Sequence, residues 1–170
     1  MATIWFKETG EMEGACGKIL ETEQAGVVIK RIHRHLIHRS KCLDARAQCE
    51  MQQWTSHLLK PANGFSLLFT PRAWLGASDE REYSMELIDC SDEINPCSKP
   101  VNQILISELK LFYEKAKESG IYPCDYELYR QSDGRIGLID FDKFSRWNKT
   151  ESEDEVVFPW GLTGKPLYPW

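Results

Sequence analysis

The sequence predicts an α+β fold, with an antiparallel sheet of about five strands and one helix followed by a smaller second part. Three observations predict it. Short β-prone runs separated by polar or glycine-containing turns occupy the first half of the chain, two segments carry apolar residues at helical spacing, and an Asp-Gly step separates two further β-prone runs. With 170 residues, the chain has the length of one ordinary domain.

Five β-prone runs make up the predicted sheet. The first begins at Ile4, and after a loop over residues 10–19 that contains several glycines the second covers residues 19–22. The third, residues 26–32, carries a central lysine. Two more runs cover residues 65–69 and 82–88. Because short polar turns join the early runs, they favour an antiparallel meander.

Two segments predict amphipathic helices. Within residues 40–59, apolar residues recur at spacings of four, four, three and four, and Lys60-Pro61 ends the pattern. The same spacing follows Pro100, which suits the first turn of a helix, and Gly120 provides a stop. The predicted buried faces are Leu43, Ala47, Met51, Trp54 and Leu58 in the first helix, and Val101, Leu105, Leu109, Phe112 and Ala116 in the second.

A β-hairpin is predicted within residues 120–144. Residues 126–130 would form its first strand, and Asp133-Gly134 tolerates the positive φ angles of a tight primed turn. The second strand, residues 136–139, would then deliver Asp140 at its end. An acidic residue at the end of a buried strand is a candidate ligand-binding residue.

A polar linker around residues 91–99 divides the chain into residues 1–92 and residues 93–170, which we expect to form one compact unit. The segment from Val156 to Trp170 is rich in proline and tryptophan. We expect its aromatic side chains to pack on the domain, and the alternative is an interaction strip for a partner.

Composition excludes several classes of function. The net charge of −5 argues against a nucleic-acid partner. No run approaches the ~20 apolar residues of a membrane span, so we expect no membrane partner. Six cysteines without a CxxC pair are typical of reduced thiols in an intracellular, cytoplasmic protein. His33, His35 and His38 are irregularly spaced and lack a set of carboxylates, which argues against a metal site there.

The order of these features resembles that of the protein kinase-like family. Kinases present a glycine loop GxGxxGxV, a strand VAIK and a later Asp-Phe-Gly. Gly14 and Gly17 match two of the loop glycines, Val28 and Lys30 fall on the strand motif, and Asp140 begins an Asp-Phe step. The resemblance implies a kinase-like small lobe with a strongly reduced second lobe, because a complete kinase is considerably longer.

The resemblance also implies roles for individual residues. Lys30, Glu50 and Asp125 would take the catalytic roles of strand lysine, helix-C glutamate and catalytic-loop aspartate. Asp140 would bind Mg²⁺. The expected contacts with ATP are Gly14, Gly17, Val28, Lys30, Glu86 and Ile88.

Departures from the family pattern argue against a working protein kinase. The asparagine that follows the catalytic aspartate by five residues is missing, and Pro123-Cys124 replace the usual His-Arg. Asp142 stands in place of the glycine of Asp-Phe-Gly. In another alignment Asp125 takes the place of the asparagine, and then the catalytic aspartate is the missing residue.

These departures favour a pseudokinase-like protein that acts mainly by binding a protein partner, with weak or no binding of ATP and Mg²⁺. One alternative is an active atypical ATP-dependent phosphotransferase, since Lys30, Glu50 and Asp140 are retained. Another is a generic α+β interaction protein. A homodimer would bury apolar residues 104–113 if the reduced second lobe leaves them uncovered. Reduced relatives of this kind are familiar from large DNA viruses, so the resemblance extends to a virion-associated role.

Overall fold

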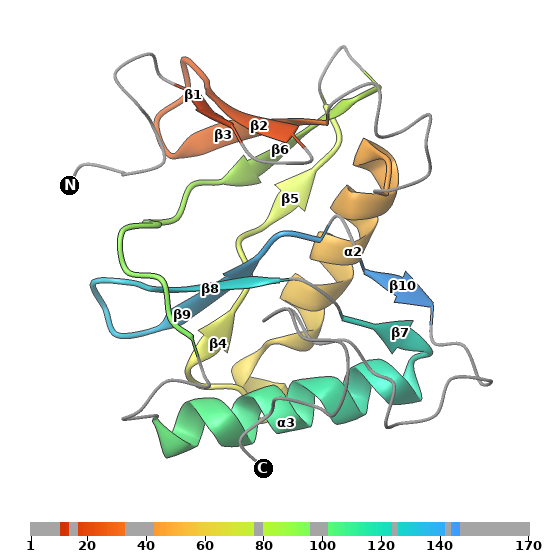
Figure 1. Ribbon diagram of the computed structural model, residues 1–170, viewed down its shortest axis with the longest axis vertical. Helices are drawn as coiled ribbons and strands as arrows, with labels where there is room; N and C mark the ends of the chain where they lie inside the picture. Colours follow the sequence, from red (N-terminus) through yellow and green to blue (C-terminus); the bar gives the residue numbers. More distant parts are fainter. Residues whose placement is uncertain are drawn as a thin grey trace.

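The computed structural model describes residues 11–13, 17–32, 43–76, 80–95, 102–123, 126–141 and 144–146. Within these ranges, two α-helices pack with a five-stranded sheet, a three-stranded sheet and a two-stranded ribbon (Figure 1). The α+β class predicted from the sequence is therefore confirmed. No helix in the described ranges is both long and apolar enough to cross a membrane.

The five-stranded sheet is antiparallel throughout, as predicted. Its strands are β1 (Glu11–Glu13), β2 (Gly17–Glu21), β3 (Val27–Ile32), β5 (Ala73–Trp74) and β6 (Glu82–Glu86), in the order β1-β2-β3-β6-β5. On the inner face, the buried residues Val28 and Met85 are cross-strand neighbours. Lys30 lies two residues further along β3 and is paired in register with the buried Tyr83.

The fourth predicted strand is wrong in its extent and its partner. Of residues 65–69, only Leu68–Phe69 forms a strand (β4), and it pairs in parallel with β9 (Ile136–Ile139) in the three-stranded sheet. The edge strand of the large sheet beside β6 is β5, which lies between the runs predicted at residues 65–69 and 82–88. Pro71 separates β4 from β5, and because proline cannot donate to a ladder, it suits the point where the chain changes sheets.

The N-terminal strands also differ from the prediction. Residues 11–13 form β1, although we expected them to belong to a glycine loop. Their register with Lys18 to Leu20 makes this segment one arm of a hairpin with β2. The strand predicted at Ile4 and the glycine at position 14 lie outside the described residues.

The helix α2 (Ala45–Leu58) begins five residues later than predicted, because the carboxylate of Asp44 caps it by accepting from the amide of Ala47 at 2.8 Å. The predicted apolar face is only half-buried, and most of it packs against the core that includes Leu105, Leu109 and Phe112 of the second helix. The fully buried residues are Ala45, Gln48, Cys49, Gln52 and Thr55. The prediction missed this face because three of these five residues are polar.

The helix α3 (Gln103–Glu118) confirms its predicted face. Its buried residues include Leu105, Leu109, Phe112 and Ala116, while Val101 lies outside the described residues. Asn102 caps the helix, and Gly120 follows its end with a φ of 70°. Among the apolar residues 104–113, the chain itself buries Leu105, Leu109 and Phe112, while Ile104 is 57% exposed.

The predicted hairpin is present, with β8 (Glu127–Arg130) antiparallel to β9. Its turn is longer than the predicted primed turn. The amide of Gln131 donates to the carbonyl of Arg135 at 2.8 Å, and within this connection the positive φ is confined to Gly134. The remaining short elements are η1 (Pro61–Asn63), β7 (Ile121–Tyr122) and β10 (Ser145–Arg146), and β10 pairs with β7.

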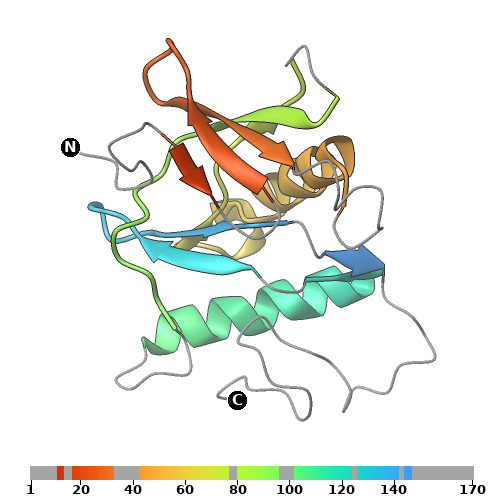
Figure 2. The same cartoon turned by 45° about the horizontal axis from the view of Figure 1, so that its top comes forward.

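The two hydrophobic cores cross the boundary expected near residue 92. Tyr129 and Ile139 join the core under the large sheet, which we call the sheet core. Leu59, Phe65 and Leu68 join the core on α3, which we call the helix core. Figure 2 shows α3 on the side of the β8–β9 hairpin that faces away from β2 and β3. The hairpin therefore lies between the two cores and contributes residues to both.

Candidate functional site

Lys30 and Asp140 are 110 residues apart in sequence and form an ion pair, in which Nζ donates to Oδ1 at 3.0 Å. Lys30 lies on β3 between the buried residues Val28 and Ile32, and Asp140 follows β9 directly. Their side chains are 11% and 28% exposed, so salt screens this pair less than one on the surface. The structure thus brings two predicted site residues together.

Asp140 adopts a left-handed backbone conformation with a φ of 74°. Among the described residues other than glycine, no second residue has a positive φ. Such a conformation costs about 1–3 kcal/mol, and aspartate tolerates it better than most residues. The chain turns here as it leaves β9, and the bond from Lys30 holds the carboxylate in place. Backbone strain of this kind is frequent at functional sites.

A second carboxylate belongs to the same region, and sequence reasoning missed it. Glu127 begins β8 and lies opposite Ile139, the residue before Asp140. Its Oε2 accepts from the hydroxyl of Tyr129 at 2.7 Å. Burial raises the pKa of Glu127 despite this bond, and the charge of Asp140 raises it further, while Lys30 acts in the opposite direction. The available signal was a glutamate at the start of a buried strand, since buried glutamates are rare unless paired.

Glu50 does not take the predicted place beside Lys30. Its side chain is 64% exposed, and its Oε1 lies 3.7 Å from Nε of Arg46, one helical turn earlier. The prediction failed because Glu50 follows the buried Cys49, and one residue turns the helix by about 100°. The place of Glu50 next to the predicted face in the sequence therefore did not show to which side of the helix its side chain points.

The buried face of α2 presents amides instead of a carboxylate. Nε2 of Gln52 donates to the carbonyl of Pro71 at 2.9 Å, and its Oε1 accepts from the hydroxyl of Tyr83 at 3.2 Å. Tyr83 is the cross-strand neighbour of Lys30. One turn earlier, Gln48 is fully buried, and its Oε1 has no hydrogen-bond partner in the described part of the chain. These glutamines are a feature that apolar spacing could not reveal.

Two of the residues predicted to contact ATP, Val28 and Ile88, are buried. Val28 is 1% exposed, and Ile88 is buried in the same sheet core. Glu86 ends β6, and its Oε1 accepts from Nε of Arg72 at 2.7 Å. Gly17 begins β2 opposite Ile32. Gly14 and Asp125, together with Cys124 and Asp142, lie outside the described residues.

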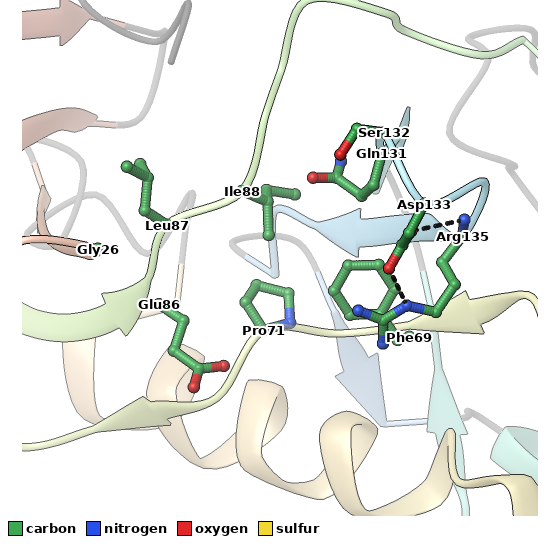
Figure 3. A pocket seen from close by; sticks show the side chains of 10 residues that line it. All are labelled: Gly26, Phe69, Pro71, Glu86, Leu87, Ile88, Gln131, Ser132, Asp133 and Arg135. Carbon is green, nitrogen blue, oxygen red and sulfur yellow. Dashed lines mark hydrogen bonds and ion pairs between the residues drawn. The ribbon is translucent and has the colours of Figure 1, made fainter. Parts of the chain in front are cut away.

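A cavity of about 400 Å³ lies beside Glu86 and Ile88, and we call it the side pocket (Figure 3). Its lining does not include Val28, Lys30 or Asp140. The lining residues are Gly26, Phe69, Pro71, Glu86, Leu87, Ile88, Gln131, Ser132, Asp133 and Arg135. Of the predicted site residues, Lys30 and Asp140 therefore form one pair and Glu86 and Ile88 line the side pocket, while Glu50 lies beside Arg46.

The carboxylates near Lys30 have the chemistry that Mg²⁺ prefers, because this ion is usually bound by one or two carboxylates together with phosphate oxygens. Asp140 and Glu127 would hold the ion, and Lys30 would attract the phosphates. Within the described ranges, no group of three or more histidine, cysteine, aspartate or glutamate side chains is placed to hold a metal. Any Mg²⁺ bound by Asp140 and Glu127 would thus need ligands from beyond the described side chains, such as the phosphates of a nucleotide.

No protein-family model matches the chain, and neither a curated protein nor a solved structure matches it. A function is therefore inferred from the geometry of Lys30, Asp140 and their neighbours.

Proposed function

We propose that the chain is a catalytically impaired, kinase-like protein that acts mainly by binding a protein partner, with weak or no binding of nucleotide. The order of a glycine-containing loop, a lysine strand, a helix and an acidic residue after a hairpin strand supports the kinase-like part. An antiparallel sheet of five strands with α2 packed near β5 and β6 is compatible with a kinase-like small lobe. In this proposal, Lys30 and Asp140 are the two residues of the kinase pattern that form the site.

The pairing of Lys30 is the observation that carries the proposal. In a working kinase, the strand lysine is held by a helix glutamate, and the aspartate binds Mg²⁺. Here Lys30 donates to Asp140 itself, while Glu50 lies beside Arg46 on the exposed side of α2. MgATP would have to break a shielded ion pair before using either group, and separating such a pair is costly. We therefore expect a low affinity for nucleotide.

The buried amides of α2 support the same conclusion. Gln48 and Gln52 lie on the side of the helix that packs in the sheet core. An amide oxygen can accept a hydrogen bond from a lysine, but it cannot neutralise the positive charge. The one carboxylate within α2 is that of Glu50, which lies beside Arg46, so this helix places amides in the fold where a kinase has its glutamate.

One observation favours a second candidate function, an active atypical phosphotransferase. Lys30, Glu127 and Asp140 come from three different strands or strand ends and influence one another electrostatically. Two carboxylates and a lysine are the groups that a magnesium–phosphate site requires. In that function, Asp140 and Glu127 would bind Mg²⁺, and Lys30 would bind phosphate.

Thermal unfolding with and without millimolar MgATP separates these functions. The proteins compared are wild type, Lys30→Ala and Asp140→Asn, with Lys110→Ala as the control, because Lys110 is an exposed lysine of α3. Each protein is compared with its own midpoint without ligand. We expect no shift in any of them.

A nucleotide at about 100 times its dissociation constant would stabilise the folded state by about 2.7 kcal/mol. For a chain of this length that corresponds to an upward shift of roughly 5–10 °C. A shift of this size in wild type and Lys110→Ala that is lost in Lys30→Ala and Asp140→Asn would reject weak nucleotide binding. Magnesium-dependent phosphoryl transfer by the same samples would then establish the second function.

A further inference from the structure

A stripe of side chains runs along one flank of α3, beside the face that the helix buries. Ile106, Tyr113 and Lys117 follow one another at spacings of seven and four, which places them on one side of the helix. We call them the α3 stripe. Ile104 and Lys115 are each two residues from a stripe residue, and two residues turn a helix by about 200°. These two side chains therefore lie on the opposite flank.

The apolar residues of the α3 stripe are only partly exposed, although they belong to neither core. Ile106 and Tyr113 are half-buried. In the described part of the chain, the side chains that pack against the sheet core or the helix core do not include them. Burial nevertheless raises the pKa of Tyr113 to about 12. The cover of this flank therefore has its source outside the two cores.

The α3 stripe combines an apolar surface with a positive charge at one end. Lys117 is a basic residue of the last turn of α3, and Tyr113 and Ile106 lie on the preceding turns. A complementary ligand would carry acids followed by apolar side chains. The chain has such a segment, since residues 151–155 contain four acids and residues 156–170 contain four aromatic residues.

The described chain leaves the fold near the charged end of the α3 stripe. The strand β10 pairs with β7, which follows α3 after a short turn, and Figure 1 shows both strands beside the last turns of this helix. From Arg146 to Glu151, an extended chain reaches about 17 Å. From Lys117 to Ile106, the stripe is about 16 Å long at 1.5 Å per residue, a length that about five extended residues cover. A segment that starts at β10 therefore reaches Lys117 first and Ile106 last.

We propose that residues 151–170 dock on the α3 stripe of the same molecule. The acidic residues 151–155 lie beside Lys117, and apolar side chains of the following residues cover Tyr113 and Ile106, so that the segment runs antiparallel to the helix. Because the segment is tethered to the fold, its effective concentration is high, and contacts of modest strength suffice. The inference goes beyond the proposed function and does not depend on it.

A photo-cross-linker in the full chain tests where the segment docks. Phe158→p-benzoylphenylalanine keeps an aromatic side chain at this position, and mass spectrometry of the irradiated protein locates the cross-links. We expect them within residues 106–117 of the same molecule. Cross-links to another part of the chain would overturn the proposal. So would a product of twice the mass, which would assign the surface to a second copy, or no cross-link, which would mean that the segment is free for a partner.

Cleavage by chymotrypsin after Trp160 measures how firmly the segment is held. When docking is fast relative to cleavage, the rate follows the population of the undocked segment. Ile106→Ser removes an apolar contact, so we expect the rate to rise about fivefold. Ile104→Ser is the matched control, because Ile104 is 57% exposed and lies on the opposite flank of α3, and it should leave the rate unchanged.

A second pair of variants tests the charge. Lys117 and Lys115 both belong to the last turn of α3, so replacing either removes a similar interaction with the helix dipole. Lys117→Gln should raise the cleavage rate about two- to threefold at low salt and by less in 1 M NaCl. Lys115→Gln should have no such effect.

The matched pairs also separate docking from the stability of α3. Unchanged rates for both Ile106→Ser and Lys117→Gln would overturn the proposal. Equal increases within each pair would overturn it too, because they would reflect a weaker helix and not a lost contact with the segment. None of these measurements involves MgATP, so their failure would leave the proposed kinase-like function standing.

Discussion

The sheet core and the helix core differ in what their helices contribute. The helix α3 buries three apolar side chains, those of Leu105, Leu109 and Phe112, in the helix core, where Tyr126 also makes edge-to-face ring contacts with Phe112 and Phe144. The helix α2 brings Gln48, Gln52 and Thr55 into the fold beside Ala45 and Cys49. Burying polar groups costs stability unless each is hydrogen-bonded. The helix core therefore mainly supplies stability, while α2 brings buried polar groups to the sheet core.

The largest effect should come from breaking the helix core. Phe112 is fully buried and its ring lies 6.0 Å from that of Tyr126, so Phe112→Ala should lower the free energy of unfolding by about 3–5 kcal/mol. Ile104→Ala, on the exposed side of the same helix, should change it by less than about 0.5 kcal/mol. Urea unfolding measures both. Equal losses would mean that the helix core is not the main source of stability.

A smaller loss is expected at the edge of the same core. The buried carboxylate of Glu108 accepts from the backbone amides of Ser66, Leu67 and Leu68 at 2.6–3.1 Å. Glu108→Ala would leave these donors without their acceptor, so we expect a loss of about 2–3 kcal/mol. Glu114→Ala provides the control, because Glu114 is exposed on α3.

Hydrogen exchange locates the effect of Glu108→Ala. Residues 66–68 should lose protection more than the middle of α3, because the carboxylate ties this loop to the helix. A uniform loss of protection across the chain, with no excess in the loop, would contradict this explanation.

In the sheet core, we expect one substitution to raise the free energy of unfolding instead of lowering it. Gln48→Leu removes an amide oxygen that is buried without a hydrogen-bond partner in the described residues, although it also gives up the bond from Nε2 to the carbonyl of Leu43. We expect a net gain in unfolding free energy of about 1 kcal/mol. Gln103→Leu, at an exposed position of α3, should be neutral. A destabilised Gln48→Leu protein would indicate that the oxygen binds a buried water.

Local signals account for the parts of the fold that the sequence predicted well. The second helix has one apolar stripe, formed by Leu105, Leu109, Phe112 and Ala116. This pattern is enough to predict a helix that is buried on one side. The hairpin follows from the glycine at position 134, whose φ of 88° few other residues adopt. Both predictions needed only neighbouring residues.

The failures lie where distant segments decide the structure. The buried face of α2 can include Gln52 because its side chain donates to the carbonyl of Pro71 and accepts from the hydroxyl of Tyr83. The sequence of the helix alone does not indicate these partners. For the same reason the pairing of Lys30 with Asp140, and the nearby Glu127, could not be read from spacing. The order of motifs did select Lys30 and Asp140 as candidates, while Gly14 and Asp125 remain predictions.

The smallest expected effect is a pH dependence in the sheet core. Burial raises the pKa of Glu127 above its ordinary value of 4.5, and Asp140 and Glu93 add to this, while the bond from Tyr129 and the charge of Lys30 oppose it. The folded state therefore favours the protonated acid. The stability that protonated Glu127 provides is fully present below its unfolded pKa and is lost as the pH rises through its folded pKa.

Glu127→Gln keeps the shape of the side chain and an acceptor for Tyr129 but cannot ionise. Its melting temperature relative to wild type should therefore rise between pH 4 and pH 7, whereas the difference for Glu114→Gln, an exposed glutamate of α3, should stay constant. Thermal unfolding across this range measures both. The prediction would be wrong if the stability of Glu127→Gln relative to wild type fell with rising pH. In that case the effects of Lys30 and Tyr129 on the pKa of Glu127 would outweigh that of burial, and the ionised carboxylate would stabilise the fold.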